Sequence, residues 1–267
     1  MTLVLKPGYS FDSDASTYID AVETADGQSL ETGVRIAIND FVLGCKQDQF
    51  WDAIKASCIL AGARTLDGAL VPLVGTAPTN FSFVAADYDR KTGLKGNGTF
   101  KRVDTNYKIS HSLTGENLHL GVVGSELLNT GRPLGVFRQA AYTRHYIPVD
   151  GFFATRSGWG NATTVVNQAS GHYISTRQTG VSPVRYYNGQ FDVALNTDNS
   201  RPSDWSVTAF VAHGSDTGLS TEPEAFNGYS TARLQMYHIG DGLSALQAAN
   251  FSTRVSNLIT AIGAAIP

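Results

Sequence analysis

The stretch "VRYYNGQFDVAL" (residues 184–195) predicts a β-hairpin. Two runs rich in β-branched and aromatic residues flank the dipeptide Asn188-Gly189, which favours a type I′ turn because that turn needs a positive φ at both central positions. We therefore expect Tyr187 and Gln190 to pair across the turn. A hairpin of this kind indicates an antiparallel sheet in this part of the chain.

Outward from the hairpin, Gly and Asn residues separate many short runs that are typical of strands. In residues 117–123, apolar side chains alternate with polar ones or glycine, which predicts a strand with one buried face. In residues 232–240, Leu234, Met236 and Tyr237 break this alternation, which predicts burial on both faces. Many short strands without helices between them predict a mainly β fold, an antiparallel β-sandwich.

The segment of residues 12–65 has a different pattern, in which apolar residues recur at helical spacing. It predicts three short amphipathic helices, over residues 12–27, 29–44 and 48–62, each ending at a glycine. Ser29 is the expected N-cap of the second helix. Each helix has one apolar face, which must pack on another layer of the fold.

The last predicted strand leads through the sequence "GDG" into a closing helix over about residues 244–262, with Ser244 as its N-cap. The sandwich and this helix together are expected to span residues 66–267. Residues 1–11 predict an extended arm that precedes the helical segment.

The composition argues against several classes of partner. The formal net charge is −3, and no block of Lys and Arg occurs, so neither a nucleic acid nor an anionic membrane surface is an expected partner. No run approaches the about 18 apolar residues of a membrane span, so no membrane insertion is expected. The first residues, "MTLVLKPGYSF", lack the basic start of a signal peptide, which predicts that the chain is not exported by that route.

The two cysteines, Cys45 and Cys58, form no C-x-x-C pair and have no histidine pair near them at metal-ligand spacing. Free cysteine is commonly a small buried hydrophobic residue, which is the expected role here. Their redox state stays open from the sequence.

The hairpin and the stretch "FNGYSTARLQMYHIGDGLSALQAANF" (residues 226–251) resemble the hairpin and closing element of concanavalin-A-like and laminin-G-like jelly rolls. Residues 51–78 and 70–106 resemble a recurrent segment of tail-fibre and other virion proteins of bacteriophages, including cyanophages. The resemblance covers roughly residues 12–262. It implies a concanavalin-A-like jelly roll within a virion protein, although sandwiches of this type host many functions.

The function that the resemblance implies is a non-enzymatic virion protein, assembled into the particle after synthesis in the host cytoplasm. A tail fibre or tail appendage that contacts a host surface glycan is the first interpretation, and a capsid decoration or cement protein is the alternative. An enzyme that degrades glycans is the third. The resemblance also implies a homotrimer that binds other virion proteins. The arm has no obvious partner in its own chain, so we expect it to make subunit or virion contacts through Leu3, Val4 and Leu5.

Candidate catalytic groups are weak in this sequence. Glycosidases of the concanavalin-A-like fold carry two carboxylates, usually as E-x-D-x-E along one strand, and this motif is absent here. Glu222 and Glu224 flank a proline, and Asp87 and Asp89 are more typical of a polar turn than of a Ca²⁺ site. The histidines form neither H-x-H nor H-E-x-x-H. We therefore expect no enzyme activity, no cofactor and no metal site.

Aromatic and cationic side chains are the remaining candidates, because sugars bind against aromatic faces with polar groups beside them. The carbohydrate-binding candidates are Arg156, Trp159, Tyr173 and Trp205. The alternative for the two tryptophans is burial in the core, since large aromatic residues are mostly buried.

Overall fold

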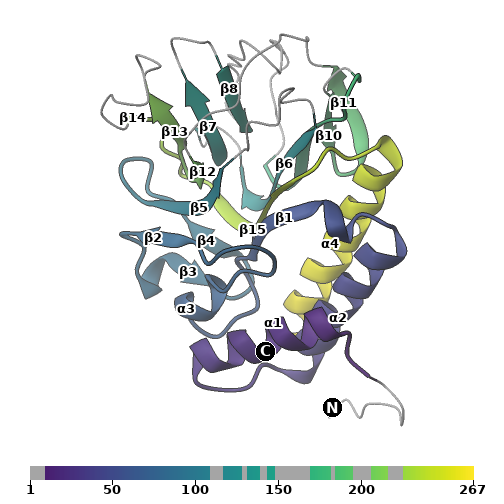
Figure 1. The fold of residues 1–267 in the computed structure, drawn as a ribbon. Helices are drawn as coiled ribbons and strands as arrows, with labels where there is room; N and C mark the ends of the chain where they lie inside the picture. The colour runs from purple at the N-terminus through teal and green to yellow at the C-terminus, as the bar shows by residue number, and fades with distance from the viewer. Residues whose placement is uncertain are drawn as a thin grey trace.

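The computed structural model describes residues 10–108, 117–127, 131–138, 143–147, 169–181, 184–194, 206–215 and 225–267. Within these residues the chain forms three layers: a layer of helices, an eight-stranded sheet beside it, and a seven-stranded sheet beyond (Figure 1). We call the eight-stranded sheet the helix-side sheet and the other the outer sheet. The predicted antiparallel β-sandwich with helices at its N- and C-terminal ends is confirmed.

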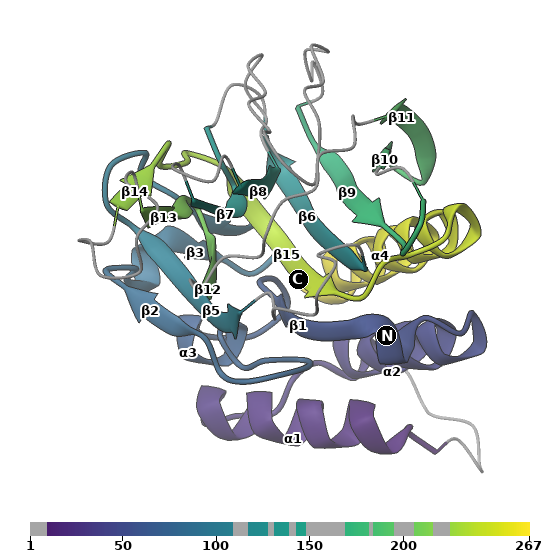
Figure 2. The same cartoon turned by 45° about the horizontal axis from the view of Figure 1, so that its top comes forward.

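Four α-helices and two 3₁₀ turns lie in the described residues: α1 (Ser13–Asp26), α2 (Thr32–Gln47), η1 (Trp51–Ala53), α3 (Leu66–Ala69), η2 (Ala85–Asp87) and α4 (Ala245–Ala265). Asp12 caps α1 by accepting from the Asp14 backbone N–H, and Gly27 ends it with a φ of 67°. Figure 2 shows α4 beside the helix-side sheet and α2 beside α4.

The helix-side sheet has the order β11 (Gln190–Ala194), β10 (Val184–Tyr187), β9 (Gly171–Arg177), β6 (Leu118–Glu126), β15 (Arg233–Gly240), β4 (Gly93–Lys95) and β3 (Tyr88–Asp89), and β1 (Ile54–Ile59) also pairs with β15. The outer sheet has the order β14 (Ala225–Asn227), β13 (Ala212–Ser215), β7 (Leu134–Arg138), β12 (Ser206–Ala209), β5 (Arg102–Lys108) and β2 (Thr79–Phe81), with β8 (Thr143–Ile147) on β7. The pairings are antiparallel except that of β13 with β7.

The hairpin that opened the sequence analysis is confirmed. Asn188 and Gly189 have φ angles of 47° and 78°, and Tyr187 pairs with Gln190. Two positive φ values are what a type I′ turn requires, so β10 and β11 form the predicted hairpin at one edge of the helix-side sheet.

The third predicted helix, over residues 48–62, is wrong. Its place is taken by η1 and by β1, which pairs antiparallel with β15 and sets Cys58 opposite Tyr237. The strand is buried on both faces, with Lys55 as its exposed residue. A strand with two buried faces loses the period-two alternation, so its apolar residues also fit helical spacing.

The other helices differ from the expectation only at their ends. Glu31 is the N-cap of α2 in place of Ser29 and makes no side-chain capping bond, and the helix continues past Gly44 to Gln47. Ser244 caps α4 as predicted, in a capping box with Gln247.

Burial of β6 also differs from the prediction of one buried face. Leu118, Leu120 and Val122 pack between the two sheets, while His119 on the opposite face is equally buried. The second face is covered because α4 lies over it, which local alternation cannot show. The prediction that β15 is buried on both faces is confirmed.

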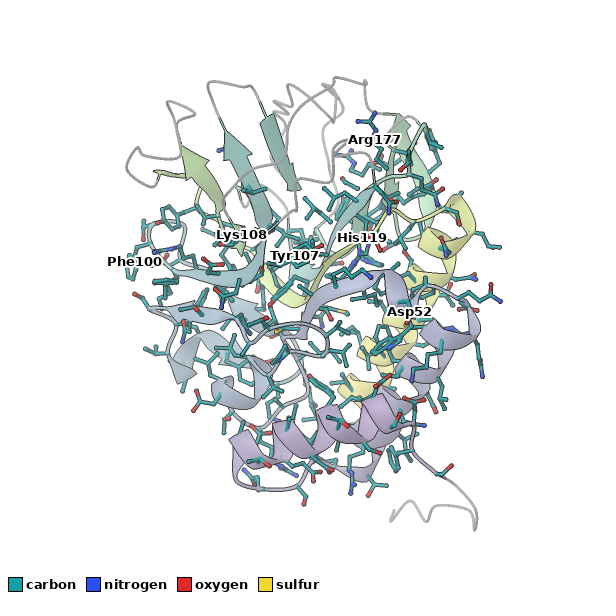
Figure 3. The ribbon with its side chains drawn as sticks, viewed as in Figure 1. Asp52, Phe100, Tyr107, Lys108, His119 and Arg177 are labelled. Carbon is teal, nitrogen blue, oxygen red and sulfur yellow. The ribbon has the colours of Figure 1, made fainter. Side chains whose placement is uncertain are left out.

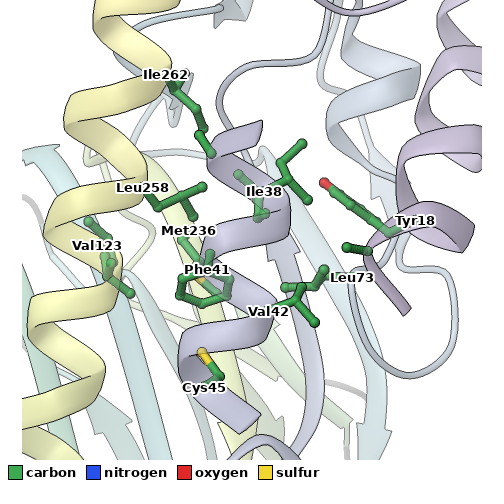
Figure 4. Close-up of a cluster of buried hydrophobic side chains, with 14 of the residues drawn as sticks. Tyr18, Ile38, Phe41, Val42, Cys45, Leu73, Val123, Met236, Leu258 and Ile262 are labelled. Carbon is green, nitrogen blue, oxygen red and sulfur yellow. The ribbon is translucent and has the colours of Figure 1, made fainter. Parts of the chain in front are cut away.

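The helices and the sheet share one hydrophobic core on the helix side (Figure 4). Phe41 of α2 and Leu258 of α4 pack over Met236 and Val123 of the sheet. Cys45 and Cys58 are buried free thiols, as expected. No helix in the described part of the chain has the length and hydropathy that crossing a membrane requires.

Candidate functional site

A groove of about 690 Å³ lies between α4 and the helix-side sheet, next to the Asn188-Gly189 turn. Its lining comes from β6, β9, the turn, β15 and α4, and comprises Val123, Gly124, Ser125, Ser170, Gly171, His172, Tyr187, Asn188, Gln235, Ser252, Thr253, Val255, Ser256, Asn257, Ile259 and Thr260. None of these described lining residues is an Asp, Glu, Lys or Arg. The groove therefore offers hydrogen-bonding groups without formal charge.

The turn forms one end of the groove because it is hydrogen-bonded to β9 and lies close to α4. The Asn188 backbone N–H donates to the His172 carbonyl at 2.8 Å, and the Asn188 side-chain oxygen accepts from the His172 N–H at 2.8 Å. A Cβ at Gly189 would lie 3.0 Å from the Ala249 Cα of α4. Glycine thus serves both the positive φ and the close approach of the turn to the helix.

The groove's other wall, α4, is fixed at its N-terminal half. Its Gln247 side chain donates to the Gln49 carbonyl at 3.0 Å, and Arg254 forms an ion pair with Asp48 at 2.8 Å. These bonds join α4 to the C-terminal end of α2. The sheet-facing side of α4 presents Phe251 and Ser252, both buried.

Beneath these two residues lies a histidine cluster, which consists of His119 on β6, His172 on β9 and His238 on β15 (His119 is labelled in Figure 3). Their exposed fractions are 0%, 3% and 0%. The rings of His172 and His238 meet Nε2 to Nε2 at 2.7 Å. The Phe251 ring covers the cluster, with its centroid 4.2 Å from that of His238.

The hydrogen bonds determine which ring nitrogens carry protons. His119 Nδ1 lies 2.6 Å from the Asp241 carbonyl and must donate to it. His238 Nδ1 is buried without a partner, and a buried bare acceptor costs less than a buried unpaired N–H. His238 therefore donates from Nε2 to His172.

His172 then holds its proton on Nδ1 and donates it to the Ser252 hydroxyl oxygen, which lies 3.0 Å away. This assignment leaves the hydroxyl hydrogen of Ser252 for another acceptor. The hydrogen bonds thus run from His238 of β15 through His172 of β9 to Ser252, one of the α4 residues that line the groove.

Burial keeps these rings neutral. Loss of solvation lowers the pKa of His119 to about 4 and that of His172 to about 3, and it lowers the pKa of His238 well below the ordinary value of 6.5. All three are consequently uncharged at neutral pH.

Gly121 provides the space for the cluster. It pairs with His238 across the β6–β15 ladder, and a Cβ at this position would lie 1.9 Å from the His238 ring. The His238 ring occupies the space that a side chain at position 121 would need.

The Ser252–His172 pair is poorly placed for nucleophilic chemistry. Ser252 and His172 have the spacing of a nucleophile and its base, but Ser252 is only 5% exposed and the low pKa of His172 makes it a poor base. In the described residues, no three His, Cys, Asp or Glu side chains converge as metal ligands. The 2.7 Å separation of the two Nε2 atoms is a hydrogen-bond distance.

No protein-family model matches the chain, and no curated protein matches it. Among solved structures it is similar to domain 4 of AbnA, a GH43 extracellular arabinanase from Geobacillus stearothermophilus, in complex with arabinotriose (10% identity, TM-score 0.37, covering 67% of this chain and 82% of that one). It is also similar to the botulinum neurotoxin serotype G binding domain (14% identity, TM-score 0.46, covering 76% of this chain and 51% of that one). A third similar structure is Trypanosoma rangeli sialidase (13% identity, TM-score 0.37, covering 84% of this chain and 40% of that one).

The chain spans about half of the neurotoxin domain and less than half of the sialidase. At these identities and TM-scores, the similarities give no indication of what this chain binds.

Of the carbohydrate-binding candidates predicted from the sequence, Tyr173 belongs to the described residues. Tyr173 is 1% exposed and packs between the sheets, with its ring centroid 4.8 Å from that of Tyr187, so it offers no face to a sugar. The other candidates and the residues of the arm lie outside the described residues: Arg156, Trp159, Trp205, Leu3, Val4 and Leu5. Asp89 accepts from the Thr92 and Lys91 backbone N–H groups, as expected of a polar turn.

The sequence interpretation missed the groove and the histidine cluster. One signal was available in the strands "NLHLGVV" and "MYHIG": each histidine alternates with the apolar residues that face the sandwich core, and so lies on the opposite face of the sheet. The sequence does not show which element covers that opposite face.

Proposed function

We propose that the chain is a non-enzymatic binding protein that holds a neutral saccharide in the groove. The observation that carries this proposal is the groove's lining, which combines hydroxyl and amide side chains with no charged group. A phosphate, sulfate or carboxylate ligand would find no cation there, whereas the hydroxyls of a neutral sugar can exchange hydrogen bonds with uncharged partners.

The lining also has the apolar surface that a sugar's C–H groups need. Ile259 on α4 and Tyr187 beside the turn are partly exposed and contribute this apolar surface. Two side-chain amides add one acceptor and one donor to the lining. Gln235 Nε2 donates to the Lys91 carbonyl, so the Gln235 side-chain oxygen remains an acceptor for a ligand. The Asn188 side-chain oxygen accepts from His172, so the Asn188 NH₂ remains a donor. Binding sites of small ligands commonly pair an apolar surface with a few placed polar groups.

Absence of catalysis is part of the proposal. Glycoside hydrolysis uses two carboxyl groups about 5–9.5 Å apart across the scissile bond. The described lining holds no carboxylate, so a sugar in this groove would be bound without being cleaved.

The biological setting that we propose is the surface of a bacteriophage particle. The support is the resemblance of residues 51–106 to a recurrent segment of virion proteins, in order with the hairpin and closing element that resemble those of concanavalin-A-like jelly rolls. In this proposal the chain is part of a tail fibre or appendage, assembled as a homotrimer through the arm, and the groove binds a host surface glycan. A capsid decoration protein is the alternative, since it would share the same segments.

The test is titration calorimetry of the chain against a panel of neutral oligosaccharides, with sialylated and sulfated ones as comparison. We expect binding of at least one neutral member. Ser256→Trp, at an exposed position of the lining, should remove it by filling the groove, and Ala264→Trp on the same helix, outside the lining, should not. Binding limited to charged sugars, hydrolysis of the ligand, or equal loss in both variants would contradict the proposal. Immunogold electron microscopy of particles would distinguish tail from capsid.

A further inference from the structure

We infer that the histidine cluster makes the groove acid-sensitive: proton uptake by the cluster separates α4 from the helix-side sheet, and the groove loses one wall. The separation concerns this chain alone, and only its effect on a ligand rests on the proposed function.

The geometry of the hydrogen bonds leaves no place for an additional proton. A proton added to His172 at Nε2 would point at the N–H of His238 across 2.7 Å, so the bond between the two rings would become a clash of two donors. A proton added to His238 at Nδ1 would face no acceptor, since that atom is buried and unpaired. A charged ring in this place would be buried and incompletely paired, which is strongly unfavourable.

The surrounding groups compensate such a charge only in part. Burial lowers the pKa of His119 more than Asp241 raises it through its backbone carbonyl and its side-chain charge, and the Asp241 side chain also pairs with Lys55 at 3.3 Å. On α4, Arg254 is bound to Asp48, and the residues that face the cluster, Phe251 and Ser252, are uncharged.

The described residues that stand opposite His119 and His238 on the neighbouring strands carry no charge. Ser57 of β1 stands opposite His238 and is neutral, and Thr176 of β9 and Gly240 of β15 stand opposite His119. Acid therefore adds positive charge to a group of three histidines, and these repel one another within the cluster.

The helix is the element that must move. β6, β9 and β15 are joined by ladders of backbone hydrogen bonds, whereas α4 is held to the sheet by side-chain packing and meets the cluster through the Phe251 ring and the single Ser252 hydrogen bond. Lifting α4 admits water to all three rings and breaks no ladder bond.

The sign of the pH effect follows from linkage. In the closed state His119 and His172 have pKa values of about 4 and about 3, below the 6.5 of a solvated histidine, so the open state binds more protons. The closed state is therefore favoured at neutral pH, and its advantage is lost progressively as the pH falls below about 6.5 toward these values.

Hydrogen exchange measured by mass spectrometry tests the inference without any ligand. Exchange is measured between about pH 7.5 and pH 5 and corrected for the intrinsic rate. As the pH falls, the protection of the α4 peptides should decrease about tenfold or more per pH unit once two rings titrate together. The α1 peptides should keep their protection. The double variant His172→Gln/His238→Phe leaves His119 as the one titrating ring of the cluster, so its α4 should lose much less protection over the same range.

An equal acid response in the double variant, or unchanged protection of wild-type α4 at pH 5, would overturn the inference. If the variant does not fold, NMR of the histidine rings in the wild-type chain provides the test. Protonated rings while α4 stays protected from exchange would contradict the mechanism. Neutral rings while α4 loses protection would contradict it as well. Saccharide binding that is independent of pH would contradict the inference alone, whereas α4 opening without any saccharide binding would leave it standing and contradict the proposed function.

Discussion

The two faces of the helix-side sheet are built from the same strands and differ in chemistry. On β6, the face toward the outer sheet carries Leu118, Leu120 and Val122, all in the sandwich core. The face toward α4 carries His119 and Gly121, followed by Val123 at the groove. Both faces are buried, so burial alone does not distinguish them.

The difference between the two faces predicts different effects of substitution on each. The sandwich face is apolar and closely packed, and loss of volume there leaves a cavity. The helix face contains neutral polar rings, of which His119 Nε2 and His238 Nδ1 have no hydrogen-bond partner, and it is covered by α4, which is held by side-chain packing in the helix-side core. We therefore expect substitutions on the first face to act on global stability and those on the second to act on α4 and the groove.

The largest effect is expected on the sandwich face. Leu120→Ala removes a side chain that is 1% exposed, and it should lower the free energy of unfolding by about 2–5 kcal/mol. Urea unfolding at pH 7 measures this, with Leu246→Ala, at a 71% exposed position of α4, as a control that stays within about 0.5 kcal/mol. A loss at Leu120 no larger than the control would remove the distinction between the faces.

The next effect concerns the helix face. Gly121→Ala places a methyl group on the His238 ring and should cost about 3 kcal/mol through overpacking. His238→Ala in the same chain should restore part of the loss, because it removes the atoms that clash. A double-mutant cycle measures the coupling, and additive effects of the two changes would show that the ring does not lie over Gly121.

A smaller effect is expected at the turn that ends the groove. Gly189→Val puts a β-branched residue at a φ of 78°, which should cost about 1–2 kcal/mol. Since the turn also contacts α4, saccharide affinity should fall with stability. Gly180→Val is the matched control, with a φ of 74° and free space around it, so it should share the backbone cost and leave affinity unchanged. Equal saccharide affinities for the two variants would show that the turn does not contribute to ligand binding in the groove.

The smallest effect is expected at the start of α4. Ser244→Ala removes the cap that accepts from the Gln247 N–H and should cost about 1 kcal/mol. Hydrogen exchange should show the loss of protection in the first turn of α4, with the strands of the sandwich unchanged. Uniform destabilisation of strands and helix would mean that α4 does not open separately from the sandwich.

Local sequence patterns were sufficient for much of the fold. The Asn188-Gly189 turn, Gly27 at the end of α1 and Ser244 at the start of α4 each depend on a few neighbouring residues, and each was predictable. β1 was not, because the two layers that bury both faces of residues 54–59 come from distant parts of the chain.

The site was less predictable for the same reason. His119, His172 and His238 meet only through the register of three strands that are far apart in the sequence. Nothing near any one of them indicates its partners, and the helix that covers them follows the last of these strands. The polar lining of the groove is likewise assembled from four strands or turns and one helix.

The position of β15 has a consequence for how the chain is made. β15 joins β6 to β1 and β4 in the helix-side sheet, yet its residues, 233–240, follow all those partners in the sequence. During synthesis, β1 and β4 leave the ribosome long before the strand that they flank, and α4 follows later still. Their apolar faces must wait unpaired, a condition in which newly made chains aggregate or recruit chaperones. Translation that stops before residue 233 would thus yield a chain without the centre of its sheet, which we expect to be degraded rather than to accumulate.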